Sequence, residues 1–426
     1  MYLFFIRHFN DIDHITPVVW KMKQDNRPVA VYCINPKYDI HNDYRLTFLK
    51  EQGIVVESIY HAFSQKLNML HHAMRFLFLW FFAKGKRLNS HNQENPLVLL
   101  LSQRGQLVME LIGYKLYKLT RKIFYNKNWA HYILEQSGAQ ILCFDHIIHN
   151  QYVVAVLMRA AKEMSIPTIA LPHGVYLYTN NYYKPKSSVT QRFCKFNHFN
   201  YVVVQNYLRK NVLVRSGIGE EKIFVLGSAR FCEEWIEQNK KILPRMINSN
   251  GKNAEKLKIL FLASKPQCRV DMERMLNTFD ILSNLSDIEL MVKPHTRMGV
   301  NPYLFDNLPI ASASDVATAE LCEWADVVLV IGTSVMIEAL MQGKPVLYLK
   351  YLHANIMLFE ECGACWTIHN EAELENAIQS LRAKQDNVPY TEENVNRFLS
   401  EAVYGSRTKR DVLRDYVQFI TGCDAN

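Results

Sequence analysis

Basic and hydroxyl-bearing residues follow three short apolar runs in the second half of the chain. These residues are Ser264, Lys265, Lys293, His295, Arg297, Thr333 and Ser334, and Gly332 directly precedes the last two. Lysine, arginine and histidine bind phosphate through charge-assisted hydrogen bonds, and the N–H groups at the start of a helix favour an anion. Ligands of parallel sheets bind at the carboxyl ends of the strands, where the three segments are expected to lie. The pattern predicts a site for a diphosphate or a nucleotide phosphate.

The segment 325–349 is typical of a strand, a turn, a helix and a second strand. Gly332 permits the turn, and Thr333 or Ser334 could cap the helix that follows. Glu338 stands one helical turn further on, among apolar neighbours, where its carboxylate could accept a hydrogen bond from a ribose or sugar hydroxyl. An ordinary βαβ crossover with a solvated glutamate is the alternative interpretation.

A histidine follows a predicted strand directly in the first half of the chain, within Pro172-His173-Gly174. Histidine is the usual general base near neutral pH, and Gly174 would let a substrate approach the backbone closely. Asp145 and Asp13 also lie at or just beyond predicted strand ends, and either could orient His173 or replace it as the base. A histidine bonded within a turn and a helix-capping Asp13 are the structural alternatives.

No metal site and no bound cofactor are expected. Asp11 and Asp13 have the spacing of a metal-binding carboxylate pair, but no third carboxylate stands near them. Cys362 and Cys365 form a lone CxxC pair, which fits a turn and a core better than metal or redox chemistry. The chain has neither a phosphate-binding P-loop nor a G-x-G-x-x-G sequence, so ATP hydrolysis and NAD chemistry are not indicated.

Short apolar runs alternate with helical patterns through both halves of the chain, which is typical of parallel sheets. We therefore predict an α/β protein with two tandem Rossmann-like domains that face each other across a cleft, followed by C-terminal helices. The expected domains are an acceptor-binding domain at 1–238 and a nucleotide-donor-binding domain at 257–426. A stretch at 239–256 that is rich in Lys, Asn, Pro and Gly should link them.

The composition limits the partners. The 426 residues carry a net charge of +8, which suits an anionic substrate or membrane surface; the basic residues are spread along the chain without a nucleic-acid-binding signature. Nine cysteines, mostly within apolar runs, favour reduced thiols and a cytoplasmic protein. Neither a signal peptide nor an apolar run long enough to span a membrane is found.

Two predicted helices combine aromatic and basic residues, at Leu67–Lys86 and Leu107–Tyr125. Such helices fit peripheral contact with the inner face of an anionic membrane, and core helices with solvated charges are the alternative. The apolar run Leu97–Leu101 between them is expected to form a strand.

The order of these motifs resembles a known fold family. Pro172-His-Gly174, Lys293-Pro-His295 and Gly332-Thr-Ser334, the last followed by Glu338 and Gly343-Lys-Pro345, are similar to GT-B glycosyltransferases. The nearest likeness is to bacterial capsule polysaccharide synthesis proteins and to CDP-glycerol glycerophosphotransferases. Lys293-Pro-His295 replaces the usual His-Pro-His, and Thr333-Ser334 replaces Ser-Ser, so the donor nucleotide stays open among CMP, CDP and UDP.

The resemblance implies a metal-independent, inverting transfer from a nucleotide-activated donor to a glycan or lipid-linked glycan of capsule, O-antigen or teichoic-acid type. It assigns catalysis to His173 and donor phosphate binding to His295, Thr333 and Ser334, while Lys265 and Arg297 would also stabilise the leaving phosphate. Fixed positive groups would then do the work of a metal. A UDP-sugar 2-epimerase, which would need more carboxylates in the cleft, and a non-catalytic membrane-associated assembly protein are the alternatives.

Overall fold

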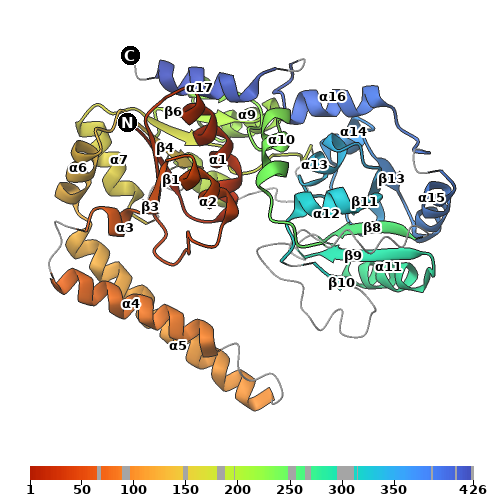
Figure 1. The fold of residues 1–426 in the computed structure, drawn as a ribbon, viewed down its shortest axis with the longest axis horizontal. Helices are drawn as coiled ribbons and strands as arrows, with labels where there is room; N and C mark the ends of the chain where they lie inside the picture. Colours follow the sequence, from red (N-terminus) through yellow and green to blue (C-terminus); the bar gives the residue numbers. More distant parts are fainter. Residues whose placement is uncertain are drawn as a thin grey trace.

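The structure is a computed structural model that describes residues 1–64, 69–88, 96–146, 152–179, 188–195, 197–247, 256–263, 270–294, 311–313, 315–384, 387–407 and 410–423. Two parallel sheets with flanking helices follow one another along the chain (Figure 1). The predicted α/β fold class is thereby confirmed.

The first sheet has seven parallel strands in the order β3-β2-β1-β4-β5-β6-β7. They are β1 Tyr2–Ile6, β2 Val29–Cys33, β3 Val55–Ser58, β4 Ile141–Asp145, β5 Thr168–Leu171, β6 Tyr201–Val204 and β7 Ile223–Val225. The helices around it are α1 Phe9–Gln24, α2 Tyr44–Glu51, α3 Ile59–Ala62, α6 Lys127–Gln136, α7 Val154–Glu163, α8 Ser188–Lys195, α9 Tyr207–Arg215 and α10 Glu233–Ile242. The central strands β1 and β4 are buried along their whole length, as expected for a sheet covered on both faces.

The second sheet has six parallel strands in the order β10-β9-β8-β11-β12-β13. They are β8 Leu257–Leu262, β9 Ile288–Lys293, β10 Ala311–Ser312, β11 Val327–Val330, β12 Val346–Leu349 and β13 Trp366–Ile368. Its helices are α11 Met272–Asn284, α12 Thr318–Trp324, α13 Met336–Met341, α14 Leu358–Glu361, α15 Glu371–Ala383 and α16 Glu392–Ala402. One apolar cluster includes buried residues of both sheets, so the two domains share part of their core.

The last described helix, α17 Val412–Gly422, returns to the first domain, where it lies beside α1 (Figure 1). The hydroxyl of Tyr416 donates to the carbonyl of Gly227 at 2.9 Å, and the Ser228 N–H donates to the carbonyl of Val403 at 2.7 Å. These contacts tie α17 to the first domain, whereas the predicted bounds of 257–426 placed it in the second.

A long helical hairpin stands between β3 and β4 in the chain. It consists of α4 Met69–Leu88 and α5 Pro96–Phe124, and Figure 1 shows it projecting away from both sheets. The predicted strand at Leu97–Leu101 is therefore wrong, because these residues form the first turns of α5. A short apolar run has no periodicity that separates a strand from a buried helix. Among the described helices, none is both long enough and apolar enough to cross a membrane.

Candidate functional site

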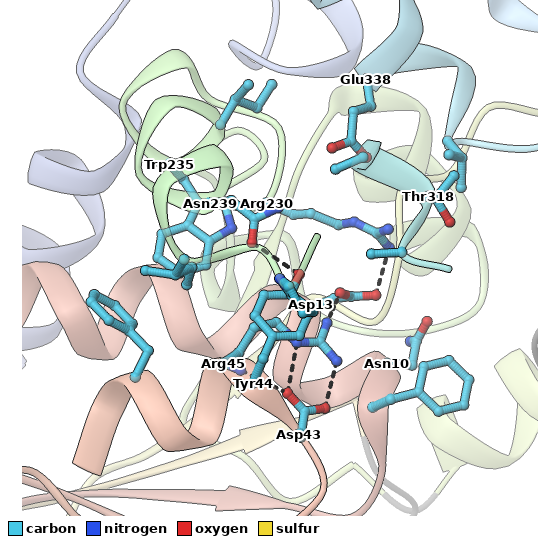
Figure 2. A pocket seen from close by; sticks show the side chains of 18 of the residues that line it. Asn10, Asp13, Asp43, Tyr44, Arg45, Arg230, Trp235, Asn239, Thr318 and Glu338 are labelled. Carbon is cyan, nitrogen blue, oxygen red and sulfur yellow. Dashed lines mark hydrogen bonds and ion pairs between the residues drawn. The ribbon is translucent and has the colours of Figure 1, made fainter. Parts of the chain in front are cut away.

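A cleft of about 1130 Å³ lies between the two domains, lined by the segments that follow their strands. The first domain contributes Asp13, His173 and Arg230, and the second contributes Ser334 and Glu338. Figure 2 shows this region, with Arg230 extending between Asp13 and Glu338. Residues that the sequence analysis placed in separate halves of the chain thus line one cavity.

His173 and Asp145 form a hydrogen-bonded pair at one wall of the cleft. Asp145 is the last residue of β4, and His173 stands two residues after the neighbouring strand β5, so the sheet brings them together. The His173 Nδ1 lies 2.6 Å from the Asp145 carboxylate. The Asp145 side chain is buried, whereas 29% of the His173 side chain is exposed, so the histidine can meet a substrate.

Arg7 holds this pair from a third strand. It follows β1, which lies beside β4, and its guanidinium donates to the carboxylates of Asp145 and Asp11. Burial alone would raise the pKa of Asp145, but the charges of His173 and Arg7 outweigh it and hold that pKa below its usual value. Burial and the nearby Asp145 charge raise the pKa of Asp11. Asp145 is therefore a fixed anion that orients the ring of His173.

The same cluster is the one place in the described residues where three potential metal ligands converge. Oxygen and nitrogen atoms of Asp11, Asp145 and His173 all lie within 4.8 Å of one another. Arg7 donates to both carboxylates, at 2.8 Å to Asp11, so a guanidinium already supplies the positive charge that a metal would bring. The premise that no third carboxylate stands near Asp11 is wrong, because the fold brings Asp145 beside it. The chemistry of the cluster is that of a charge-stabilised histidine.

Asp13 belongs to a different network. It lies within α1, which begins at Phe9, so the helix-capping alternative is wrong. Its carboxylate contacts the guanidinium of Arg45 and lies 2.8 Å from that of Arg230. Burial would raise the pKa of Asp13, but Arg230 and Arg45 together lower it. Two guanidinium partners make this carboxylate a weak base, and they make it an anchor for Arg230.

Glu338 faces this network from the second domain. Only 7% of the residue is exposed, so the alternative of a solvated helix glutamate does not hold. Burial raises the pKa of Glu338 to about 7; Arg230 opposes that shift and Asp13 adds to it. A carboxyl group poised near neutrality can both donate and accept hydrogen bonds, which suits the hydroxyls of a ribose or sugar.

The expected phosphate loops are only partly as predicted. The short helix α13 begins at Met336, later than the sequence analysis expected, and the Thr333 hydroxyl accepts from the Val335 N–H at 3.3 Å. Lys293 lines the cleft, but its ammonium donates to the carbonyls of Ala313 at 3.1 Å and Val316 at 2.7 Å. Burial lowers the pKa of Lys293. This lysine braces a loop of the cleft wall.

The other predicted residues lie partly in turns after strands and partly outside the described structure. Gly332, Thr333 and Ser334 form the turn after β11, and Gly174 has φ +89°, a conformation that glycine adopts readily. Lys265, His295 and Arg297 lie outside the described residues.

Two arginines that organise the site, Arg7 and Arg230, were not predicted from the sequence. Each stands shortly after a strand, at the edge of the sheet where ligands bind, and that position was the available signal. Their partners are distant in the chain, since Arg7 meets Asp145 and Arg230 meets Asp13. Only the folded topology brings these pairs together.

No model of a protein family matches the sequence, and no curated protein is similar to it in sequence. Solved structures are similar in fold. A UDP-N-acetylglucosamine 2-epimerase matches with a TM-score of 0.54 at 14% identity, over 99% of this chain and 96% of its own. The S. aureus MnaA–UDP co-structure gives 0.53 at 13% identity, over 100% and 98%.

A third structure, the Neisseria meningitidis UDP-GlcNAc 2-epimerase bound to UDP-GlcNAc, gives a TM-score of 0.50 at 13% identity, over 99% of this chain and 98% of its own. Similarity at these identities shows the fold: the chain has the GT-B architecture that the motif order indicated.

Proposed function

We propose that this GT-B protein is a glycosyltransferase that moves a sugar or a polyol phosphate from a nucleotide-activated donor to a surface-polysaccharide acceptor. The observation that carries the proposal is the Asp145–His173 pair, whose histidine lines the same cleft as Ser334 and Glu338 of the second domain. A base on one domain and hydroxyl-binding groups on the other suit a reaction between two bound substrates.

In the proposed reaction His173 is the general base. Because Asp145 accepts the hydrogen bond from Nδ1–H, Nε2 is the basic atom of the neutral ring. For a sugar donor, Nε2 takes the proton of the acceptor hydroxyl, whose oxygen forms a bond to the anomeric carbon. The bond from that carbon to the donor phosphate breaks, and the phosphate leaves with the electron pair. Attack on the side opposite the leaving group inverts the anomeric centre.

The leaving nucleotide needs positive charge and hydrogen-bond donors. Arg230 and the Thr333 and Ser334 hydroxyls line the cleft and are suited to this role. Lys265, His295 and Arg297 stay proposed partners of the same phosphates. The proposed acceptor is a glycan or lipid-linked glycan of capsule, O-antigen or teichoic-acid type, reached at the inner face of a membrane.

A thermal-shift screen against CMP, CDP, UDP, GDP and their common sugar conjugates tests donor binding. A ligand that binds only the folded protein raises its melting temperature. One clear hit, lost in Ser334→Ala and retained in Ser286→Ala at the other edge of the second sheet, supports the proposal. No response to any nucleotide would favour a non-catalytic assembly protein instead.

One observation favours a second candidate, a UDP-sugar 2-epimerase. That reaction needs further carboxylates beside the base, and Asp11 and Asp145 both lie next to His173. Epimerisation breaks the bond between hydrogen and carbon 2 of the sugar. Incubation with UDP-GlcNAc in D₂O would then place deuterium at that carbon without an added acceptor. A transferase leaves this hydrogen in place, so mass spectrometry separates the two activities.

A further inference from the structure

The hairpin of α4 and α5 leaves an unusual amount of apolar surface exposed to solvent. Most large apolar side chains exposed in the described residues belong to it, and Phe76 is 68% and Leu107 66% exposed. The exposed residues occur on both helices. They are Met69, Leu70, Phe76, Leu77, Trp80, Leu107, Val108, Leu111, Tyr114, Leu119 and Ile123. A water-soluble hairpin gains nothing from such a surface, so it indicates a binding partner.

The root of the hairpin is well packed. Phe78 and Tyr117 of the two helices meet at 5.5 Å between ring centroids, and Tyr117 reaches Tyr60 at 3.1 Å between hydroxyl oxygens. The His71 ring bonds the Tyr125 hydroxyl at 2.7 Å. These buried contacts join the hairpin to the first domain, while the apolar side chains on its outer faces stay exposed.

The hairpin also holds nearly all of the excess positive charge. Residues 69–124 contain nine Lys or Arg and two Glu, a net charge of +7, in a chain whose net charge is +8. Among the described side chains, Lys115, Lys118 and Lys122 lie on the exposed face of α5, interleaved with Tyr114 and Leu119. Basic groups beside exposed aromatic and aliphatic groups match the headgroup and acyl layers of an anionic membrane.

We propose that the α4–α5 hairpin docks the protein on an anionic lipid surface, with the apolar side chains entering the interface and the lysines contacting the headgroups. Charge decides among partners: two copies of a +7 hairpin repel each other, whereas anionic lipid attracts it. The apolar residues lie on the outer faces of both helices, and a lipid interface can contact both at once. The inference is independent of the transfer chemistry, since it uses none of the cleft residues.

Vesicle flotation of the full chain tests this docking. With vesicles of phosphatidylglycerol and phosphatidylethanolamine the protein should float, and with phosphatidylcholine alone it should float far less. The double variant Phe76→Ser/Trp80→Ser should remain unbound. The control Met246→Ser, which removes an exposed methionine outside the hairpin, should bind like the unmodified protein.

A second pair of variants separates local charge from net charge. Lysines near a membrane each contribute about fivefold to binding, so Lys115→Gln/Lys118→Gln/Lys122→Gln should weaken it by about two orders of magnitude. The triple control Lys23→Gln/Lys222→Gln/Lys384→Gln has the same net charge and alters exposed lysines elsewhere. If the two triple variants lost vesicle binding equally, a specific role for the hairpin would be overturned.

Two further results would also overturn the proposal. One is unchanged flotation of Phe76→Ser/Trp80→Ser. The other is a dimer, detected by light scattering, that this double variant dissociates while vesicles bind neither form; the hairpin would then be an interface between copies. Circular dichroism and the nucleotide thermal shift check that the variants are folded. The two proposals can fail separately. If the unmodified protein does not float but its melting temperature still rises with nucleotide, the docking proposal fails while the proposed function stands.

Discussion

His173 and Asp145 differ in what they contribute, although they act as a pair. His173→Ala removes the proposed base, so transfer should stop while nucleotide binding persists. Asp145→Asn keeps the shape but removes the charge that orients the ring, and general-base effects of this kind amount to about 10²–10⁴ in kcat. Transfer rates and nucleotide-induced melting shifts measured on both variants check the prediction. Substantial turnover in His173→Ala would move the base role to another residue.

Glu338 makes stability depend on pH. Its pKa is raised from 4.5 to about 7, so between these values the folded protein binds more protons than the unfolded chain. The folded state is therefore favoured below pH 4.5, and this advantage is lost as the pH rises through 7. Glu338→Gln should be more stable than the unmodified protein at pH 8, by up to about 3 kcal/mol, and nearly equal at pH 4.5.

Denaturant unfolding of the two proteins at several pH values measures this difference. A stability difference that is the same at pH 4.5 and pH 8 would mean that Glu338 is not buried as a carboxylic acid. Glu392→Gln, an exposed glutamate at the start of α16, serves as the control and should show no such pH dependence.

Gly227 of the first domain lies in close contact with the C-terminal segment of the chain. It has φ +84°, and a Cβ there would lie 2.3 Å from the Val403 carbonyl oxygen of the segment before α17. Gly227→Ala should lose about 2–5 kcal/mol of stability, because overpacking adds to the left-handed backbone. Gly138→Ala is the matched control: φ is +54° there, with no atom within 4 Å, so only about 1 kcal/mol should be lost. Equal melting temperatures for the two variants would show that the contact with Val403 is unimportant.

At the scale of elements, the sequence predicted the strands well and failed where local pattern is ambiguous. β1, β4 and β11 are short, apolar and buried, and a short apolar run between turn residues can be recognised as a strand from sequence. The run Leu97–Leu101 has the same local appearance, yet it begins a helix that packs against α4. Contacts with α4 determine that these residues are helical, and the local sequence contains no signal for those contacts.

The candidate site followed the same division. His173 and Asp145 could be found from their positions at strand ends, and Glu338 from its position one helical turn after Ser334. The roles of Arg7 and Arg230 could not, because a guanidinium becomes part of a site only through partners that the topology supplies. The structural role of Lys293 could not be predicted either, because its ammonium donates to backbone carbonyls that only the fold brings near it.

At the scale of the whole molecule, one apolar cluster runs through both domains and the C-terminal segment. The two domains should therefore unfold together in one calorimetric transition, and a bound nucleotide should raise the melting temperature of that whole transition. Two separate transitions, with only the second-domain one raised by nucleotide, would contradict this coupling. Tyr416→Ala, which removes a fully buried ring between α17 and Gly227, should lower the melting temperature of the whole transition.

The return of α17 to α1 also sets an order for synthesis. The ribosome synthesises α1 early and α17 after every other described element. The face of α1 that α17 covers therefore stays exposed to solvent until α17 has been made. Contacts between such distant segments form slowly, and the open apolar face is a place for nascent chains to aggregate or to recruit a chaperone. A translation stop in the second domain would thus leave the first domain unfinished, although its own sheet had already been made.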